Sequence, residues 1–220
     1  MGKDFDGTTL TQCFDVVAKC GGELEAMCST LTELFSNALP AAEAKWVGDA
    51  SSDTRPDGSG WVSIDYLWWL PIGPKKSSTK KMYLGYQISL MGDGVAIPGI
   101  PAQEPLIHVF LWSSVPSFEN EYYLGFPFEA DQGLVGTENG LIEWNVGEGY
   151  EWSGRPTIWT FSIKLFTLNS REDLLQYVVN PAVGLLNGKN VSVALPDSIP
   201  GLVRYTNEQF GISNVPIQDA

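Results

Sequence analysis

The sequence contains a single histidine, His108, and lacks the common short signatures of catalysis. With one histidine, neither a two-histidine metal motif nor a mechanism that needs two imidazoles can be built. The chain has no phosphate loop of the type G-x-x-x-x-G-K-[ST], no G-x-G-x-x-G turn and no G-x-S-x-G nucleophile elbow. These absences exclude the best-known nucleotide-binding and serine-hydrolase motifs. We expect no cofactor and no metal site.

Long apolar runs are also missing. No stretch of 18 apolar residues occurs, so no membrane-spanning helix is expected. The first residues, MGKDFDG, are acidic and polar, and they do not form the basic and apolar regions of a secretory signal. The three cysteines, Cys13, Cys20 and Cys28, are an odd and clustered set, which is not typical of a disulfide framework. We therefore expect a cytoplasmic protein with reduced thiols.

Charge is scarce and mostly negative. Only 18% of the residues are charged, and 26 acidic against 13 basic residues give a net charge of −13. Such a chain repels phosphate backbones and anionic headgroups, so we expect neither nucleic-acid nor membrane binding. No Lys or Arg occurs between Lys81 and Arg155. The same segment holds ten carboxylates: Asp93, Glu104, Glu119, Glu121, Glu129, Asp131, Glu138, Glu143, Glu148 and Glu151.

Aromatic residues, in contrast, are abundant, with eight Trp, eight Tyr and ten Phe. Alternating apolar patterns predict strands over 61–70, 81–91, 106–113, 122–128, 141–146 and 157–168, and a short strand in VSVAL at 191–195. In the strand at 157–168, Trp159, Phe161, Ile163 and Leu165 alternate with Thr160, Ser162 and Lys164. This alternation predicts one buried and one solvent-facing side of the sheet.

Apolar residues spaced by three and four predict an amphipathic helix from about 8 to 38, with the three cysteines on its buried stripe. Gly21 and Gly22 lie in its middle and leave open whether it is one rod, a kinked helix or two helices. A second helix is predicted over about 170–187. Ser170 with Asp173 resembles a capping box, Asn187-Gly188 is a stop, and Pro181 should divide this helix.

The succession of elements predicts an α+β fold in a single domain over 1–220. We expect a mostly antiparallel sheet of roughly six to seven strands, with the helices at about 8–38 and 170–187 packed on one face. The polar stretch 48–60, GDASSDTRPDGSG, should be a loop between the first helix and the sheet, and 190–220 an irregular C-terminal segment. The hairpin from Trp61 to Leu90 is the centre of this arrangement, and its turn carries Lys75, Lys76, Lys80 and Lys81.

One weak catalytic constellation can be drawn from the strands. Asp65, Gln87 and His108 fall on the less apolar side of three predicted strands. If these strands are neighbours, Asp65 and His108 could form a general-base pair. A buried structural histidine is the alternative, and the cysteines are expected to be structural because desolvation disfavours thiolates.

The acidic segment also carries aromatic residues beside its carboxylates. Aromatic side chains provide large contact areas at a small entropic cost, which suits a protein-binding surface. We predict a partner-binding surface made of Glu119, Glu121, Tyr122, Tyr123, Glu148, Tyr150, Glu151 and Trp152. A solvated acidic face that only keeps the protein soluble is the alternative.

These observations favour a non-enzymatic, cytoplasmic protein that docks a basic protein partner, in the manner of a bacterial immunity protein or secretion chaperone. The alternatives are a carboxylate-based hydrolase of the glycosidase type, with or without His108, and a carbohydrate-binding module. The oligomeric state is left open, and association of the acidic segment with the lysine-rich turn of a second copy is one possibility.

Overall fold

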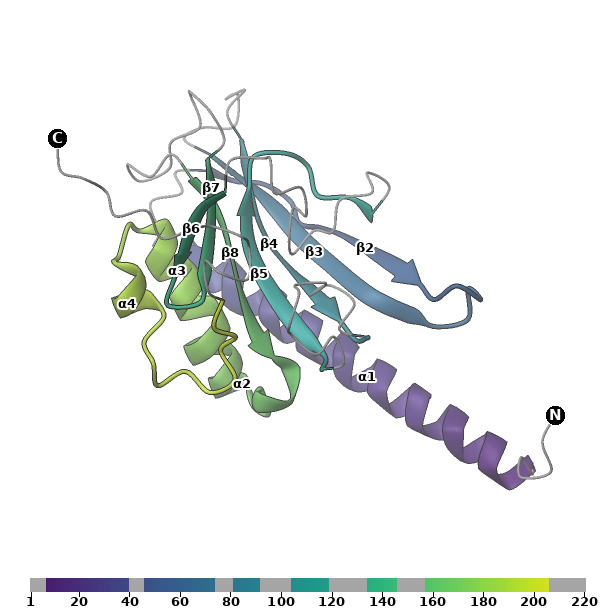
Figure 1. The fold of residues 1–220 in the computed structure, drawn as a ribbon. Coiled ribbons are helices and arrows are strands. Elements are labelled where there is room, and N and C mark those ends of the chain that lie inside the picture. Colours follow the sequence, from purple (N-terminus) through teal and green to yellow (C-terminus); the bar gives the residue numbers. More distant parts are fainter. Residues whose placement is uncertain are drawn as a thin grey trace, which may run out of the picture.

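A computed structural model describes residues 7–39, 46–73, 81–91, 104–118, 134–145 and 157–205. The chain begins with one continuous helix, α1 (Gly7–Ala38), so Gly21 and Gly22 do not divide it. Helix α1 lies diagonally under a twisted sheet, and its N-terminal half projects beyond the sheet (Figure 1). The predicted helix over 8–38 is therefore confirmed.

Among the described residues, eight strands form one sheet in the order β1-β3-β4-β5-β8-β7-β6, with β2 also paired to β3. Every strand pair is antiparallel. The predicted α+β class with a mostly antiparallel sheet is thus confirmed. The strands are β1 (Trp46–Val47), β2 (Ser51–Pro56), β3 (Ser63–Gly73), β4 (Met82–Ser89), β5 (Leu106–Trp112), β6 (Leu134–Glu138), β7 (Leu141–Asn145) and β8 (Thr157–Lys164).

Short helical segments follow β8. Ser170 caps the first of them, and its side chain accepts a hydrogen bond from the Asp173 backbone N–H. Pro181 does not break the helical path, because a wide π-helical turn precedes it and accommodates the missing N–H. Gly188 ends the path with φ of 73°. These segments are η3 (Leu165–Thr167), α2 (Arg171–Asp173), η4 (Leu174–Val179), α3 (Asn180–Leu186) and α4 (Val191–Ala194).

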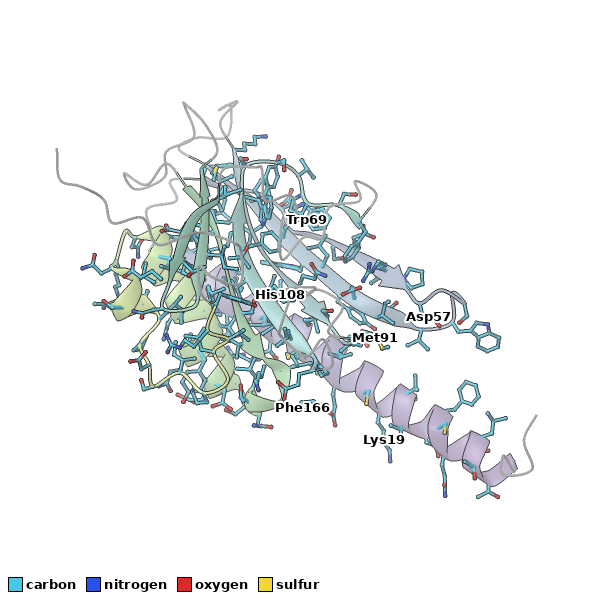
Figure 2. The ribbon with its side chains drawn as sticks, viewed as in Figure 1. Lys19, Asp57, Trp69, Met91, His108 and Phe166 are labelled. Carbon is cyan, nitrogen blue, oxygen red and sulfur yellow. The ribbon has the colours of Figure 1, made fainter. Side chains whose placement is uncertain are left out.

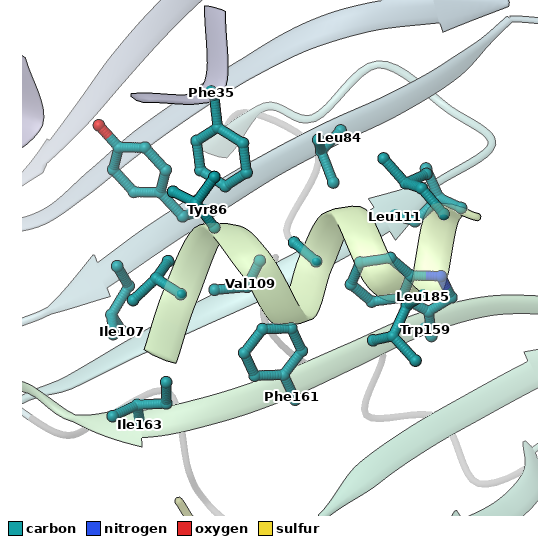
Figure 3. Close-up of a cluster of buried hydrophobic side chains, with 14 of the residues drawn as sticks. Phe35, Leu84, Tyr86, Ile107, Val109, Leu111, Trp159, Phe161, Ile163 and Leu185 are labelled. Carbon is teal, nitrogen blue, oxygen red and sulfur yellow. The ribbon is translucent and has the colours of Figure 1, made fainter. Parts of the chain in front are cut away.

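The hydrophobic core lies between one sheet face and the helices α1, η4 and α3 (Figure 3). Phe35 of α1 stacks on Trp68 of β3 and Tyr86 of β4, with ring centroids 5.7 and 6.4 Å apart. Because side chains alternate along a strand, Trp159, Phe161 and Ile163 of β8 all point into this core. The predicted buried face of β8 is confirmed.

The opposite face of β8 is not solvated as predicted. Thr160 and Ser162 are fully buried, and only Lys164 at the strand end is exposed. The prediction assumed that a polar residue on a strand marks a wet face. It is wrong here because this side of the sheet carries a second apolar cluster, in which Trp69, Trp112 and Phe118 pack against the buried Leu67 and Phe110.

Two local predictions are also wrong. Residues 51–56, placed in a loop, form the edge strand β2, which needs no apolar pattern because it pairs through its backbone and keeps most side chains in solvent. VSVAL was predicted as a strand, but Val191–Ala194 form α4, which buries Val191 and Ala194 three positions apart. The predicted strand at 122–128 lies outside the described residues.

Candidate functional site

A buried polar row crosses the sheet on the face opposite α1. Gln87 of β4 pairs directly with His108 of β5, and His108 pairs with Ser162 of β8. Asp65 of β3 lies diagonally beside Gln87, because β3 and β4 align Leu67 with Gln87 and Asp65 with Ser89. All of these side chains are buried. The sequence-based expectation that Asp65, Gln87 and His108 share one sheet face is confirmed.

Asp65 is held by two partners at one end of this row. The Arg55 Nε donates to Oδ2 at 2.6 Å, and the Gln87 Nε2 donates to Oδ1 at 3.1 Å. Arg55 comes from the edge strand β2, where the register places it directly opposite Asp65. A buried carboxylate needs such an ion pair and hydrogen bonds to offset its desolvation. Arg55 was assigned to a loop by its polar neighbours, so the sequence pattern did not reveal this ion pair.

His108 contacts Ser162 at the other end of the row, with 2.7 Å between Nδ1 and Oγ. Burial lowers the pKa of His108 to about 3, because desolvation disfavours the charged imidazolium. The imidazole is therefore neutral at pH 7. Tyr205 also lies at this end: burial raises the pKa of its hydroxyl, and a hydrogen bond with Ser162 opposes that shift.

The row does not have the geometry of an accessible catalytic pair. Asp65 and His108 lie on strands two positions apart in the sheet, a separation of about 9.5 Å by ordinary strand spacing. The two oxygens of Asp65 are occupied by Arg55 and Gln87. His108 and Ser162 resemble a base and a nucleophile in distance, but both are fully buried. Ser162 was missed because its strand side was predicted to be wet.

A separate groove opens where α1 leaves the sheet, with a volume of about 480 Å³. Carboxylates of Glu25 and Asp53 and the aromatic rings of Tyr66, Trp68 and Tyr86 belong to its lining. The Asp53 Oδ1 accepts a hydrogen bond from the Thr54 backbone N–H. The groove could accommodate a few side chains of another polypeptide.

The cysteines do not form the predicted buried stripe. Cys13 and Cys20 are exposed, and Cys28 is half-buried. The spacing of apolar residues by three and four correctly predicted the helix. The sheet, however, does not extend far enough to cover the first half of α1. Burial raises the pKa of the Cys28 thiol, so the expectation of an inert thiol applies to Cys28.

The predicted partner-binding residues Glu119, Glu121, Tyr122, Tyr123, Glu148, Tyr150, Glu151 and Trp152 all lie outside the described residues. Of the acidic segment, the structure describes Glu104, Glu138 and Glu143. Glu104 forms an ion pair with Lys164 at 2.6 Å. Its cation therefore comes from outside the segment, as the sequence required.

Within the described ranges, no group of three or more His, Cys, Asp or Glu side chains is placed to hold a metal ion. None of the described helices combines the length and the apolar character needed to cross a bilayer.

Comparisons of the chain with protein-family models, curated proteins and solved structures find no match.

Proposed function

We infer that this protein is a non-enzymatic binding protein that docks a basic protein partner through its acidic segment, residues 93–152. It would neutralise or escort that partner, as an immunity protein or a chaperone does. The observation that carries this proposal is the uncompensated excess of carboxylates, 26 acidic against 13 basic residues.

Internal ion pairs do not reduce this excess. Arg55, Lys164, Arg171 and Arg204 each pair with a carboxylate of the same chain. Each pair uses one cation and one anion, so the net charge of −13 is unchanged. Fewer cations are then left to reduce the negative electrostatic potential of the molecule. Complementary potential of this kind steers a cationic partner and speeds its encounter.

The buried polar row favours a binding role over hydrolysis at Asp65 or His108. A carboxylate-based glycosidase needs two carboxyl groups roughly 5 to 9.5 Å apart in a cleft that admits a sugar. Asp65 is instead buried and paired with Arg55, and His108 is buried against Ser162. We assign both residues to the stability of the sheet.

Association kinetics test the proposal. A pull-down from native lysate at low salt, eluted by salt and identified by mass, supplies the partner. A variant with Glu119, Glu121, Glu148 and Glu151 changed to Lys should then associate at least about tenfold more slowly, because steering is lost. The control carries the same change of charge at exposed carboxylates outside the segment: Asp15, Glu23, Asp49 and Glu172.

We expect the wild-type association rate to fall steeply with ionic strength and the control variant to lose less than the first one. Equal rates in the two variants would show that the acidic segment does not direct binding. A captured partner without a basic surface would also refute the proposal.

A further inference from the structure

Helix α1 continues well beyond the sheet that it packs on (Figure 2). Residues 10–20 are all exposed, and the first buried side chain of the helix is Leu24. We call residues 7–23 the arm, which is about 25 Å long at 1.5 Å per residue. A helix of this length without packing partners is only marginally stable in water. A surface that packs against the arm would therefore stabilise it.

The arm carries the same apolar stripe that anchors the second half of α1. Leu10, Cys13, Val17 and Cys20 repeat at intervals of three and four, and the pattern runs on through Leu24, Met27, Leu31 and Leu34. This is the heptad spacing of a helix that packs along another helix. On the arm the stripe is open: Leu10 is 48% and Val17 is 45% exposed, and Phe14 beside the stripe is 54% exposed.

Charge distinguishes the arm from the rest of the molecule. Two copies with a net charge of −13 each repel one another over most of their surfaces. The arm carries one positive charge, Lys19, and two negative charges, Asp15 and Glu23. None of the three lies at a position of the apolar stripe. An apolar, nearly neutral stripe is the surface on which a second copy can approach without that penalty.

We propose that two copies of this chain dimerise by antiparallel pairing of their arms. With residue 15 at the twofold axis, Leu10 lies opposite Cys20 of the second copy and Cys13 lies opposite its Val17. Large side chains thus face small ones, as knobs-into-holes packing prefers. We call the rest of the molecule, beyond residue 23, the body. Antiparallel pairing places the two negatively charged bodies at opposite ends of the paired arms, whereas parallel pairing would place them side by side.

The groove beside Glu25 lies at the base of the arm, because Gly21 and Cys28 of α1 line it. In the antiparallel pair, Gly7 of one copy reaches the level of Glu23 of the other. The tip of each arm thus ends at the entrance to the partner copy's groove. The contact is at the small end of specific interfaces, so the dimer is reversible and concentration-dependent.

Sedimentation equilibrium from micromolar to millimolar protein tests the dimer. The variant Leu10→Glu/Val17→Glu places carboxylates in the seam and should weaken dimerisation at least about 100-fold. The matched control Gln12→Glu/Ala18→Glu adds the same charge at exposed positions away from the stripe and should keep the wild-type dissociation constant. Unfolding of the body, monitored by tryptophan fluorescence, should be unchanged in both, because the arm lies outside the core.

A cysteine experiment tests the direction of pairing. In Val17→Cys, the introduced thiol faces Cys13 of the second copy, so mild oxidation should give a covalent dimer. Ala18→Cys, one position on and turned outward, should not. Wild-type protein should cross-link poorly, because in this register each native cysteine is offset from every cysteine of the second copy by at least three residues, about 4.5 Å along the helix.

A wild-type protein that stays monomeric up to millimolar concentration overturns the proposal, and so does a dimer that survives Leu10→Glu/Val17→Glu. Rapid cross-linking of the wild type would indicate parallel arms and refute the antiparallel pairing. High salt should preserve the apolar contact. A dimer that dissociates in high salt would indicate association of the acidic segment with the lysine-rich turn instead.

Discussion

Six polar side chains are fully buried on the sheet face opposite α1: Asp65, Gln87, Ser89, His108, Thr160 and Ser162. Burial of a polar group costs free energy unless the group finds partners. Here Arg55, Gln87 and Ser162 supply them for Asp65 and His108. A slip of one residue in any strand would move these groups into the apolar core on the other face. The polar row therefore fixes the register of β3, β4, β5 and β8.

The buried imidazole makes stability depend on pH. His108 has a pKa of about 3 in the folded protein and an ordinary value of 6.5. Between these values the unfolded chain binds a proton that the folded protein does not. The free energy of unfolding should therefore fall as the pH falls below about 6.5, by up to about 1.4 kcal/mol per pH unit from this residue.

Urea unfolding of wild type and His108→Gln between pH 7 and pH 4.5 measures this contribution. Glutamine cannot titrate, so the pH slope of the variant should be flatter than that of the wild type. Carboxylates titrate in both proteins and cancel in the difference. Identical slopes would mean that His108 protonates equally in the folded and unfolded states.

At the scale of elements, glycines have opposite roles in α1 and in β4. Gly22 lies inside a helix, at the base of the arm, and a Cβ there would meet no atom within 4 Å, so Gly22→Ala should stabilise the arm helix locally by about 0.5–1 kcal/mol. A Cβ at Gly85 would lie 2.5 Å from the Trp68 carbonyl oxygen and 2.6 Å from the Phe110 Cζ. Gly85→Ala should therefore lower the free energy of unfolding by about 1–3 kcal/mol.

Chemical denaturation of Gly85→Ala and wild type measures this loss, and Gly22→Ala should denature like wild type because the arm lies outside the core. Far-ultraviolet circular dichroism should show slightly more helix for Gly22→Ala. If Gly85→Ala is as stable as wild type, the close contact of β3, β4 and Phe110 described above does not exist in solution.

Periodicity predicted the elements that bury a regular apolar face against a partner. The α1 stripe and the alternation of Trp159 and Phe161 in β8 gave the correct element and the correct buried face. The same stripe could not show where its partner ends, because a heptad pattern is identical on a covered and an uncovered turn. This is why Cys13 and Cys20 were placed in the core although they are exposed.

Elements without such a pattern were missed. Strand β2 is held by backbone pairing at an edge, and its composition resembles a loop. Strand β6 was not predicted either, although the sequence carries a hairpin signal there. Asn139 and Gly140 form the two-residue turn between β6 and β7, with φ of 48° and 87°. In the candidate site, the alternation of side chains along each strand predicted that Asp65, Gln87 and His108 lie on one sheet face. Arg55 and Ser162 could be added only once strand order and register were known.

At the scale of the whole molecule, the net charge of −13 opposes folding as well as self-association. The ion pairs on the surface offset this repulsion only weakly. Lys164–Glu104, Arg171–Glu33 and Arg204–Asp197 all join exposed side chains, and solvent screens such pairs. The more buried pair, Arg55–Asp65, is screened much less by salt. Repulsion among carboxylates should therefore dominate the salt response.

We expect NaCl to stabilise the protein at pH 7. Raising its concentration from about 10 mM to about 150 mM shortens the Debye length from about 30 to about 8 Å. The resulting gain should be about 1 kcal/mol, or about 2–4 °C in Tm. Thermal unfolding at low micromolar protein measures it without a contribution from dimerisation. At pH 5, closer to the pI of 4.3, the same salt increase should have a smaller effect because the molecule carries less charge. A Tm that falls with salt at pH 7 would mean instead that the exposed ion pairs outweigh the repulsion.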